Sequence, residues 1–305
     1  MKKKYTEADT PPADQPDEWL YVHHNSKEMK TYPIAKINLG LNIVRRRPDG
    51  YHDLETVFYP VPLCDELNVE PMADDDPCPH PCDLLMADGG KLDCDPQQNL
   101  VVRAYQLLRQ EFPHLPRVRA TLRKVIPSQA GMGGGSSDCA SMLCLLNEQF
   151  QLGLTPEQLI ERAAWLGADC PFFVIAQPAY AEGIGERLVP IHLDLSGWYL
   201  AIVRPDIPVP TREAFALIKP QQPLQNCRDI VARPVEEWKD ALTNDFEASV
   251  FVQHPELGAV KQQLYRLGAV YAAMSGSGSS LFGLFRHDIQ LEEHFPDMFT
   301  KTILL

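Results

Sequence analysis

The chain has 305 residues, a length that favours about two domains, and its 45% hydrophobic and 23% charged residues are typical of an ordinary soluble globular protein. Its formal net charge of −13 argues against a nucleic-acid partner. No apolar run is long enough for a membrane span or a secretion signal. We therefore expect a cytoplasmic protein with no nucleic-acid and no membrane partner, whose eight cysteines are reduced thiols.

The N-terminal part of the sequence changes character near Thr31. Residues 1–29 mix Pro, Asp, Lys and His without periodicity and are predicted to be a mobile leader. Apolar patterns at 32–44 and 54–61 predict two strands, and the turn-rich residues 45–50 between them predict a hairpin.

Residues 71–96 hold the one cysteine pattern that suggests a metal. Cys78, His80, Cys82 and Cys94 could supply ligands for zinc, but their single-residue gaps differ from those of common structural zinc sites. Because the segment is also rich in Pro, Asp and Gly, we expect a metal-free surface loop.

The most informative segment runs from Pro127 to Asp138 and carries four glycines. A helix is predicted before it at 100–111, followed by a strand near 117–124, whose residues alternate between apolar and polar. Ser136, Ser137 and Asp138 are natural N-cap residues for a following helix. A glycine-rich turn that ends at a helix N-terminus directs backbone N–H groups at an anion, so the segment predicts a phosphate-binding loop.

Two familiar phosphate loops do not match this segment. A P-loop needs Lys directly after its last glycine, and the dinucleotide motif needs Gly where Ser136 stands. A third kind of loop, or a plain connector, is therefore required.

The second half mixes helices and strands. Thr155, Pro156 and Gln158 predict a helix start with a capping box. Further strands are expected at 199–203, 269–273 and 280–285, and further helices at 211–218, 234–242 and 255–267. Since strands and helices do not alternate strictly, the sequence predicts an α+β fold with antiparallel sheets and packed helices, and not a doubly wound parallel sheet.

Three more segments suggest chemistry when they are taken together: 35–39, 167–173 and 274–280. Phosphoryl transfer to an alcohol needs a base and a cation, and Asp169 and Lys36 are candidates for these roles. Each has an ordinary alternative, because a single Lys on a strand is usually solvated and a single Asp before a Pro-containing turn usually shapes the turn. The segment 274–280 either closes over phosphate or is a tight turn between strands.

These segments resemble one known family. The glycine-rich stretch is similar to the phosphate loop of the galactokinase, homoserine kinase, mevalonate kinase and phosphomevalonate kinase superfamily, with Met132 in place of the usual Leu. Residues 35–39, 47–52 and 54–56 resemble the opening signature of the 4-diphosphocytidyl-2-C-methyl-D-erythritol kinases. The resemblance covers about residues 31–285 and excludes the insert at 71–96.

The resemblance implies a two-domain kinase whose active site lies in a cleft between the domains. The domains implied are an N-terminal ATP-binding domain at 30–182 and a C-terminal domain at 183–305 that contributes to the acceptor site. ATP and Mg²⁺ are the implied cofactors, and a cytidine diphosphate-linked methylerythritol is the implied substrate, phosphorylated at its 2-hydroxyl. The sequence gives no signal for an oligomeric state.

The resemblance also implies roles for individual residues. Asp169 would be the catalytic base, and Lys36 would lie beside it, lower its pKa and stabilise charge on the transferring phosphoryl group. The residues implied for the acceptor are Asn38, Tyr51, His52, Thr211 and Phe215. The residues implied for ATP are Pro127, Ala130, Gly131, Met132, Gly133, Gly134, Gly135, Ser136 and Ser137. Ser136, Ser137 and Asp138 all remain candidates for contacting the metal.

Two alternatives stay open at this stage. One is a sister kinase that acts on homoserine or mevalonate. Residues 48–52 and Phe215 argue against it, because they favour an acceptor that carries a nucleotide. The other is a nucleotide-binding relative without catalytic activity, against which the presence of Lys36 and Asp169 speaks.

Overall fold

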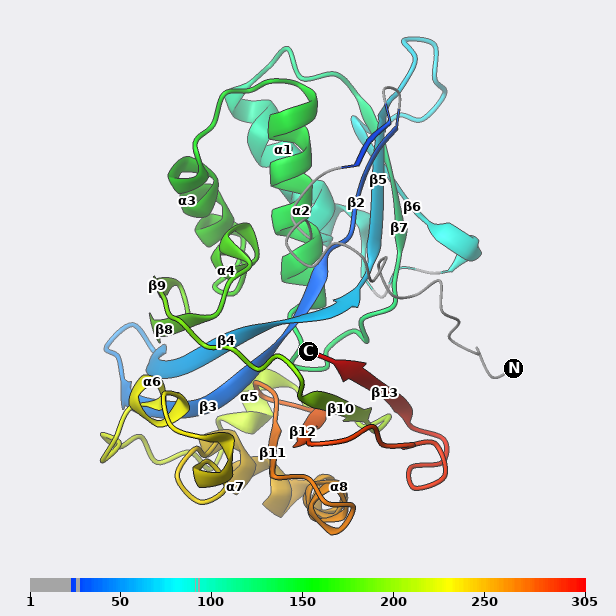
Figure 1. Ribbon diagram of the computed structural model, residues 1–305. Helices are drawn as coiled ribbons and strands as arrows, with labels where there is room; N and C mark the ends of the chain where they lie inside the picture. The colour runs from blue at the N-terminus through cyan, green and yellow to red at the C-terminus, as the bar shows by residue number, and fades with distance from the viewer. Residues whose placement is uncertain (1–22, 26–27, 91, 93) are drawn as a thin grey trace. The chain divides into compact units, whose positions relative to one another are not determined.

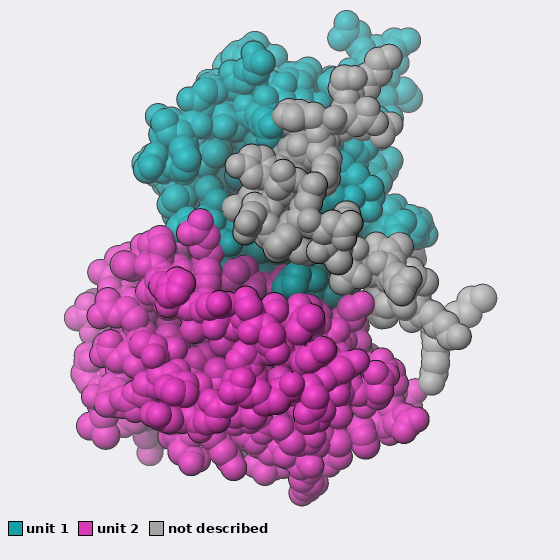
Figure 2. Space-filling view, in the orientation of Figure 1, with its two compact units in different colours: residues 1–35, 62–126, 133–176 teal, residues 36–61, 127–132, 177–305 magenta. Residues whose placement is uncertain are grey.

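The computed structural model describes residues 23–25, 28–90, 92 and 94–305. Residues 1–22 and 26–27 of the predicted leader lie outside the described residues. The chain divides into two compact units, shown in Figure 2, and both are discontinuous in sequence. Unit 1 takes residues 1–35, 62–126 and 133–176, and unit 2 takes residues 36–61, 127–132 and 177–305. The predicted division at 182/183 is linear in the sequence, whereas these units interleave.

Unit 1 is built on a mixed sheet with the strand order β1-β2-β5-β7-β6 (Figure 1). Its strands are β1 (His23–Asn25), β2 (Glu28–Thr31), β5 (Glu66–Pro71), β6 (Cys82–Met86) and β7 (Val118–Arg123). Its helices are α1 (Leu100–Glu111), α2 (Gly134–Gln149), α3 (Pro156–Leu166) and α4 (Cys170–Ile175), with 3-10 turns η2 (Ala87–Gly89) and η3 (Pro96–Gln98). Strand β7 pairs antiparallel with β5 and parallel with β6.

The core of unit 1 follows from the alternation in β7. Val118, Ala120 and Leu122 are buried, and they share one apolar cluster with residues of α1 and α2. Figure 1 shows these two helices beside the sheet. The predicted helix at 100–111 is confirmed with both its ends, and Asn99 caps it by accepting from the Val101 N–H.

Unit 2 holds two sheets, with the strand orders β3-β4-β8-β9 and β11-β12-β10-β13. The strands are β3 (Ile34–Arg46), β4 (His52–Cys64), β8 (Ala179–Gly183), β9 (Arg187–Pro190), β10 (Tyr199–Arg204), β11 (Tyr271–Met274), β12 (Leu281–Phe285) and β13 (Phe299–Leu304). The helices are α5 (Thr211–Ala214), α6 (Cys227–Val231), α7 (Asp245–Gln253) and α8 (Pro255–Arg266), with the 3-10 turn η4 (Val235–Glu237). Strands β3 and β4 form the predicted hairpin, whose turn is closed by a hydrogen bond from Arg47 N to Tyr51 O (2.7 Å).

Residues of β3, β10 and β12 share a second apolar cluster with α7 and α8. The long β3 thus connects the hairpin sheet to the helices that cover the other sheet of this unit. The predicted α+β class with antiparallel sheets and packed helices is confirmed. Among the helices of the described residues, none is long and apolar enough to cross a membrane.

Several predicted boundaries are wrong. Strand structure begins at β1 and not near Thr31. Strand β1 pairs with β2, and β2 pairs with β5, so both early strands belong to the sheet of unit 1. Helix α2 begins at Gly134, with Gly133 in the left-handed region as its N-cap (φ 73°). Ser136, Ser137 and Asp138 therefore lie inside the helix and do not cap it. The predicted helix at 211–218 ends at Ala214.

The predicted helix at 234–242 is reduced to the turn η4. Trp238 is fully buried, its indole N–H donates to Arg233 O (3.0 Å), and its ring contacts the Tyr271 ring with centroids 5.6 Å apart. This packing overrides the local helical preference. No sequence pattern predicted the strands β5, β6, β8, β9 and β13 or the helices α4, α6 and α7.

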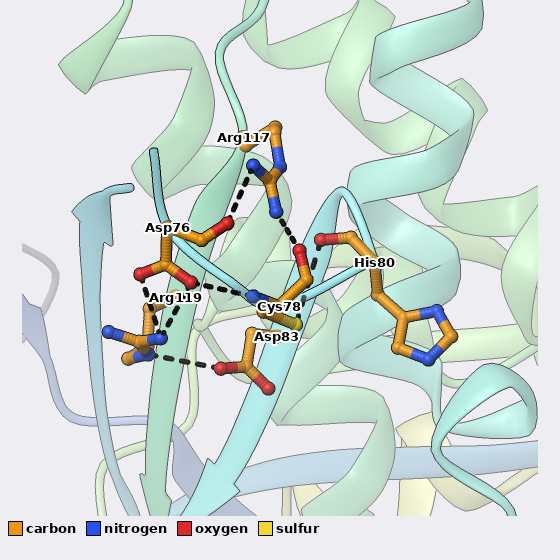
Figure 3. Close-up of polar contacts among 6 residues, drawn as sticks. All are labelled: Asp76, Cys78, His80, Asp83, Arg117 and Arg119. Carbon is orange, nitrogen blue, oxygen red and sulfur yellow. Dashed lines mark hydrogen bonds and ion pairs between the residues drawn. The ribbon is translucent and has the colours of Figure 1, made fainter. Parts of the chain in front are cut away.

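The insert at 71–96 is not the pure loop that we expected, because it contributes β6 to the sheet of unit 1. Figure 3 shows how it is fixed. Arg119 forms ion pairs with Asp76 and Asp83, both at 3.0 Å, and the Arg117 guanidinium donates to Cys78 O. Arg119 on β7 and Arg117, the residue directly before this strand, thus hold the start of the insert against the sheet.

Candidate active site

Lys36 lies on β3 with its side chain buried, 3% exposed. Its ammonium group donates to Asn38 Oδ1 (2.6 Å) and to Gly131 O (3.0 Å), and it lies 5.1 Å from the centre of the Phe58 ring. The Lys36 backbone N–H donates to Met132 O (3.0 Å). The structure therefore joins the candidate catalytic lysine to the first half of the glycine-rich loop.

That half of the loop is packed against the small-residue turn at 275–280. Ser275 Oγ donates to Gly131 O (2.9 Å), and the Ser280 N–H donates to Ala130 O (3.2 Å). Gly131 has φ +74°, and a Cβ added to it would lie 1.9 Å from Ser275 O. Glycine is required here because two backbone segments meet, which is a structural reason independent of any ligand.

The second half of the loop opens α2 in unit 1. No side chain of the described residues caps this helix, so the backbone N–H groups of its first turn remain available for an anion. A Cβ at Gly134 would come 3.2 Å from Lys124 Nζ, whereas a Cβ at Gly135 would meet no described atom within 4 Å. Of these two glycines, Gly135 is therefore the one whose backbone a ligand can approach without a neighbouring side chain in the way.

A buried charge cluster lies beneath this helix start. The Lys124 ammonium forms ion pairs with Asp138 (2.7 Å) and with Asp65, which also accepts from the backbone N–H groups of Val125 (2.6 Å) and Ile126 (2.9 Å). Burial opposes the Lys124 charge, but the two carboxylates outweigh it and raise its pKa. Burial raises the pKa of Asp138 to about 8, against the opposing effect of Lys124.

The candidate acceptor residues lie in unit 2. The His52 imidazole, at the start of β4, stacks on the Phe215 ring with centroids 4.6 Å apart and an angle of 18° between the planes. Burial and the Arg46 charge lower the pKa of His52. Thr211 is the first residue of α5, four residues before Phe215, and the Tyr51 ring is 61% exposed.

Asp169 lies in unit 1 directly before α4, at its N-cap position. Its backbone carbonyl accepts from the Phe172 N–H (3.2 Å), and Pro171 occupies the first turn. The rigid proline and the helix start fix the backbone of Asp169.

The predicted residues divide between the units. Those in unit 2 are Lys36, Asn38, Tyr51, His52, Pro127, Ala130, Gly131, Met132, Thr211 and Phe215. Those in unit 1 are Gly133, Gly134, Gly135, Ser136, Ser137 and Asp169. Within unit 2 the structure brings Lys36 to Asn38 and the loop, and His52 to Phe215.

Sequence reasoning gave no role to Thr56, Asp65, Lys124 or the Ser275 hydroxyl. Lys124 follows the alternating residues of β7 directly before the glycine loop, which was the available signal. The described part of the chain contains no group of three or more His, Cys, Asp or Glu residues arranged to hold a metal ion.

Comparison with known proteins gives matches to two family models. The GHMP kinases N terminal domain matches residues 99–177, and the GHMP kinases C terminal domain matches residues 221–295. The two matches fall on either side of residue 182.

Curated relatives are similar over most of their length. The 4-diphosphocytidyl-2-C-methyl-D-erythritol kinase of Bacteroides fragilis is 54% identical over 257 residues, which is 84% of this chain and 92% of the relative. The protein of the same name from Bacteroides thetaiotaomicron is 54% identical over 267 residues, 87% of this chain and 95% of the relative.

Two solved structures share the fold of this chain, and one of them is a kinase of the same name as these relatives. A crystal structure of 4-(cytidine 5'-diphospho)-2C-methyl-D-erythritol kinase superposes with a TM-score of 0.73 at 32% identity, covering 90% of this chain and 98% of that one. The homoserine kinase of Cytophaga hutchinsonii shares the fold with a TM-score of 0.59 at 16% identity, covering 93% of this chain and 96% of that one. By its sequence identity and its coverage of these relatives, the chain belongs to the 4-diphosphocytidyl-2-C-methyl-D-erythritol kinase family of the GHMP kinases.

Proposed function

We propose that the chain transfers the γ-phosphoryl group of ATP to the 2-hydroxyl of 4-diphosphocytidyl-2-C-methyl-D-erythritol, in the non-mevalonate route to isoprenoid precursors. The 54% identity to kinases of this name supports the choice of substrate. The observation that supports the chemistry is Lys36, whose buried ammonium is held by an amide oxygen and by a carbonyl of the glycine-rich loop. A cation fixed beside a phosphate loop can stabilise charge on a transferring phosphoryl group.

The ATP phosphates bind at the start of α2. The N–H groups of its first turn and the positive end of the helix dipole favour an anion, and Gly135 leaves the backbone accessible. The residues before Gly133 contribute by holding the loop on the turn at 275–280.

Mg²⁺ accompanies the nucleotide and shields the charge of its phosphates when it is bound. Of the three candidate ligands, Asp138 pairs with Lys124 through Oδ2, while its buried Oδ1 has no hydrogen-bond partner among the described residues. Ser136, Ser137 and Asp138 Oδ1 would hold the ion. The Ser137 hydroxyl is buried and has no hydrogen-bond partner among the described residues, which fits this assignment.

In the reaction, Asp169 accepts the proton of the 2-hydroxyl as that oxygen attacks the γ-phosphorus in line. Lys36 stabilises the charge that develops on the phosphoryl oxygens. The transfer is direct, and no covalent enzyme intermediate is required.

Tyr51, His52 and Phe215 hold the cytidine end of the acceptor, and Thr211 lies near the reacting groups. Because the imidazole of His52 covers one face of Phe215, a cytosine ring that stacks on that face must displace it. The exposed ring of Tyr51 offers a second stacking surface.

A panel of acceptors tests the proposed function. Purified protein is supplied with ATP, Mg²⁺ and one of three alcohols: 4-diphosphocytidyl-2-C-methyl-D-erythritol, homoserine or mevalonate. We expect phosphate transfer to the first compound. Transfer to either of the others in its place, or ATP binding without transfer to any, would overturn the proposal.

A further inference from the structure

A directed series of hydrogen bonds starts at the ammonium group of the candidate catalytic lysine and ends at a backbone carbonyl. The Lys36 ammonium donates to Asn38 Oδ1 (2.6 Å), Asn38 Nδ2 donates to Thr56 Oγ1 (3.0 Å), and the Thr56 hydroxyl donates to Gly40 O (2.5 Å). Lys36, Asn38 and Gly40 lie on β3, and Thr56 lies on the neighbouring β4. We call this series the relay.

Elementary chemistry fixes the direction of the relay. An ammonium group has donors but no acceptor, so it is the oxygen of the Asn38 amide that faces Lys36. The amide nitrogen must then face Thr56, whose hydroxyl accepts this bond and gives its own proton to the Gly40 carbonyl. Rotating the amide by half a turn would place its NH₂ group against the ammonium, which leaves donors facing donors.

A second set of hydrogen bonds, centred on Ser275, connects to the same lysine through backbone groups. Ser275 Oγ accepts from the Asn38 N–H (3.3 Å) and donates to Gly131 O (2.9 Å). The same Gly131 carbonyl accepts from the Lys36 ammonium (3.0 Å). Ser275 therefore contacts the Gly131 carbonyl that accepts from Lys36, and it also contacts the backbone of Asn38, whose side-chain oxygen accepts from Lys36.

Burial makes these contacts hard to replace. Lys36 is 3% exposed, Asn38 2%, Ser275 1% and Thr56 0%. Little water can reach the site to substitute for a lost partner, and a hydrogen bond is stronger in such surroundings than at the surface. A lysine side chain has a flexible four-carbon stem, so its ammonium stays in place only where partners fix it.

We propose that Thr56 and Ser275 are positioning residues that hold the Lys36 ammonium for phosphoryl transfer. Thr56 acts through the Asn38 side chain, and Ser275 acts through Gly131 and the Asn38 backbone. The inference rests on the proposed function, because it takes Lys36 as the group that stabilises the transferring phosphoryl.

The first test compares substitutions at Thr56. Thr56→Val keeps the shape and removes the hydroxyl, whereas Thr56→Ser keeps the hydroxyl. Thr302→Val is the control, because Thr302 lies on β13 in the other sheet of the same unit, where its hydroxyl donates to the Ile289 carbonyl (2.8 Å). A misplacement of about 1 Å costs about a hundredfold in rate, so we expect Thr56→Val to lower kcat about 10- to 100-fold with KM for ATP nearly unchanged. Thr56→Ser should recover most of the loss, and the control should resemble the parent. Parental kcat in Thr56→Val, or a Thr56→Ser variant that is no better, would overturn the proposal.

The second test asks whether Thr56 acts through Lys36. In a Lys36→Met background, Thr56→Val should cause no further loss of kcat, because the group that it positions is already absent. Losses that multiply would mean that Thr56 acts by another route. Ser275→Ala provides the same cycle should Thr56→Val not fold, as judged by thermal unfolding.

The third test does not depend on turnover. In the ¹H–¹⁵N spectrum of the protein without ligands, the side-chain amide signals of Asn38 can be assigned by their loss in Asn38→Ala. They should shift in Thr56→Val and stay in place in Thr302→Val, whereas unmoved signals in Thr56→Val would refute the relay. If the protein transfers no phosphate to its acceptor, the proposed function fails, and the relay is still decided by these signals.

Discussion

Replacing Gly131 by alanine tests the packing of the glycine-rich loop against the turn at 275–280. The added Cβ would lie 1.9 Å from Ser275 O, whereas ordinary contact begins near 3.4 Å. The two backbone segments would therefore have to separate by about 1.5 Å, a displacement larger than the one that costs about a hundredfold in the rate of a positioned reaction.

Gly153 supplies a matched control for this substitution. Gly131 and Gly153 both have φ +74°, but a Cβ at Gly153 meets no described atom within 4 Å. Both alanine variants bear the cost of a left-handed conformation, about 1–2 kcal/mol. Gly131→Ala alone also bears an overpacking cost of about 1–3 kcal/mol.

Chemical unfolding of the two variants measures the free energy of unfolding, and ATP-dependent turnover reports the position of Lys36. We expect Gly131→Ala to be the less stable of the two by about 1–3 kcal/mol and to lose turnover, while Gly153→Ala keeps the parental kcat. Equal losses of stability in both variants would refute the idea that contact with Ser275, and not φ alone, demands glycine at 131.

Four further predictions concern the proposed roles and the buried cluster. Asp169→Asn should lower kcat about a hundred- to ten-thousandfold in the acceptor assay, while the ATP affinity measured by calorimetry is retained. Phe215→Ala should mainly raise the acceptor KM, by about 5- to 150-fold, since stacking on a base contributes about 1–3 kcal/mol; an unchanged KM would exclude that role. Gly135→Val should weaken ATP binding in a stable protein, whereas Gly134→Val should also lose stability, because its Cβ would crowd the side chains beneath the helix. The pKa of Asp138 in the folded protein, about 8, lies above its ordinary value of 3.8, so its contribution to stability is greatest at acid pH and is lost as pH rises between these values. The free energy of unfolding of Asp138→Asn should therefore rise relative to that of the parent from pH 5 to pH 8. A pH-independent difference between the two proteins would count against the raised pKa.

Features with a local cause could be predicted from the sequence. The capping box at Thr155 and Gln158 is present as expected, with Thr155 Oγ1 accepting from the Gln158 N–H and Gln158 Oε1 accepting from the Thr155 N–H. The burial of one face of β7 could also be predicted, because the apolar and polar residues alternate within the six residues of the strand itself.

Features with a distant cause could not be predicted. Nothing near Trp238 in the sequence shows that its ring packs against Tyr271, so the helix expected there was wrong. The reason for glycine at 131 lies in Ser275, more than a hundred residues away. The candidate catalytic residues were found by resemblance to a family, and the partners that hold Lys36 became visible only when β3 and β4 were seen as neighbours.

The pairing of β4 with β8 has a consequence for synthesis of the chain. Strand β4 pairs with β8 along Leu54–Phe58, yet β8 begins only at Ala179. On the ribosome, the hairpin of β3 and β4 must therefore wait with an unpaired edge while the remainder of unit 1 is translated. Unit 1 can form its sheet and helices first, and unit 2 can close only late, so the interval before β8 emerges is when the nascent chain most needs protection from aggregation.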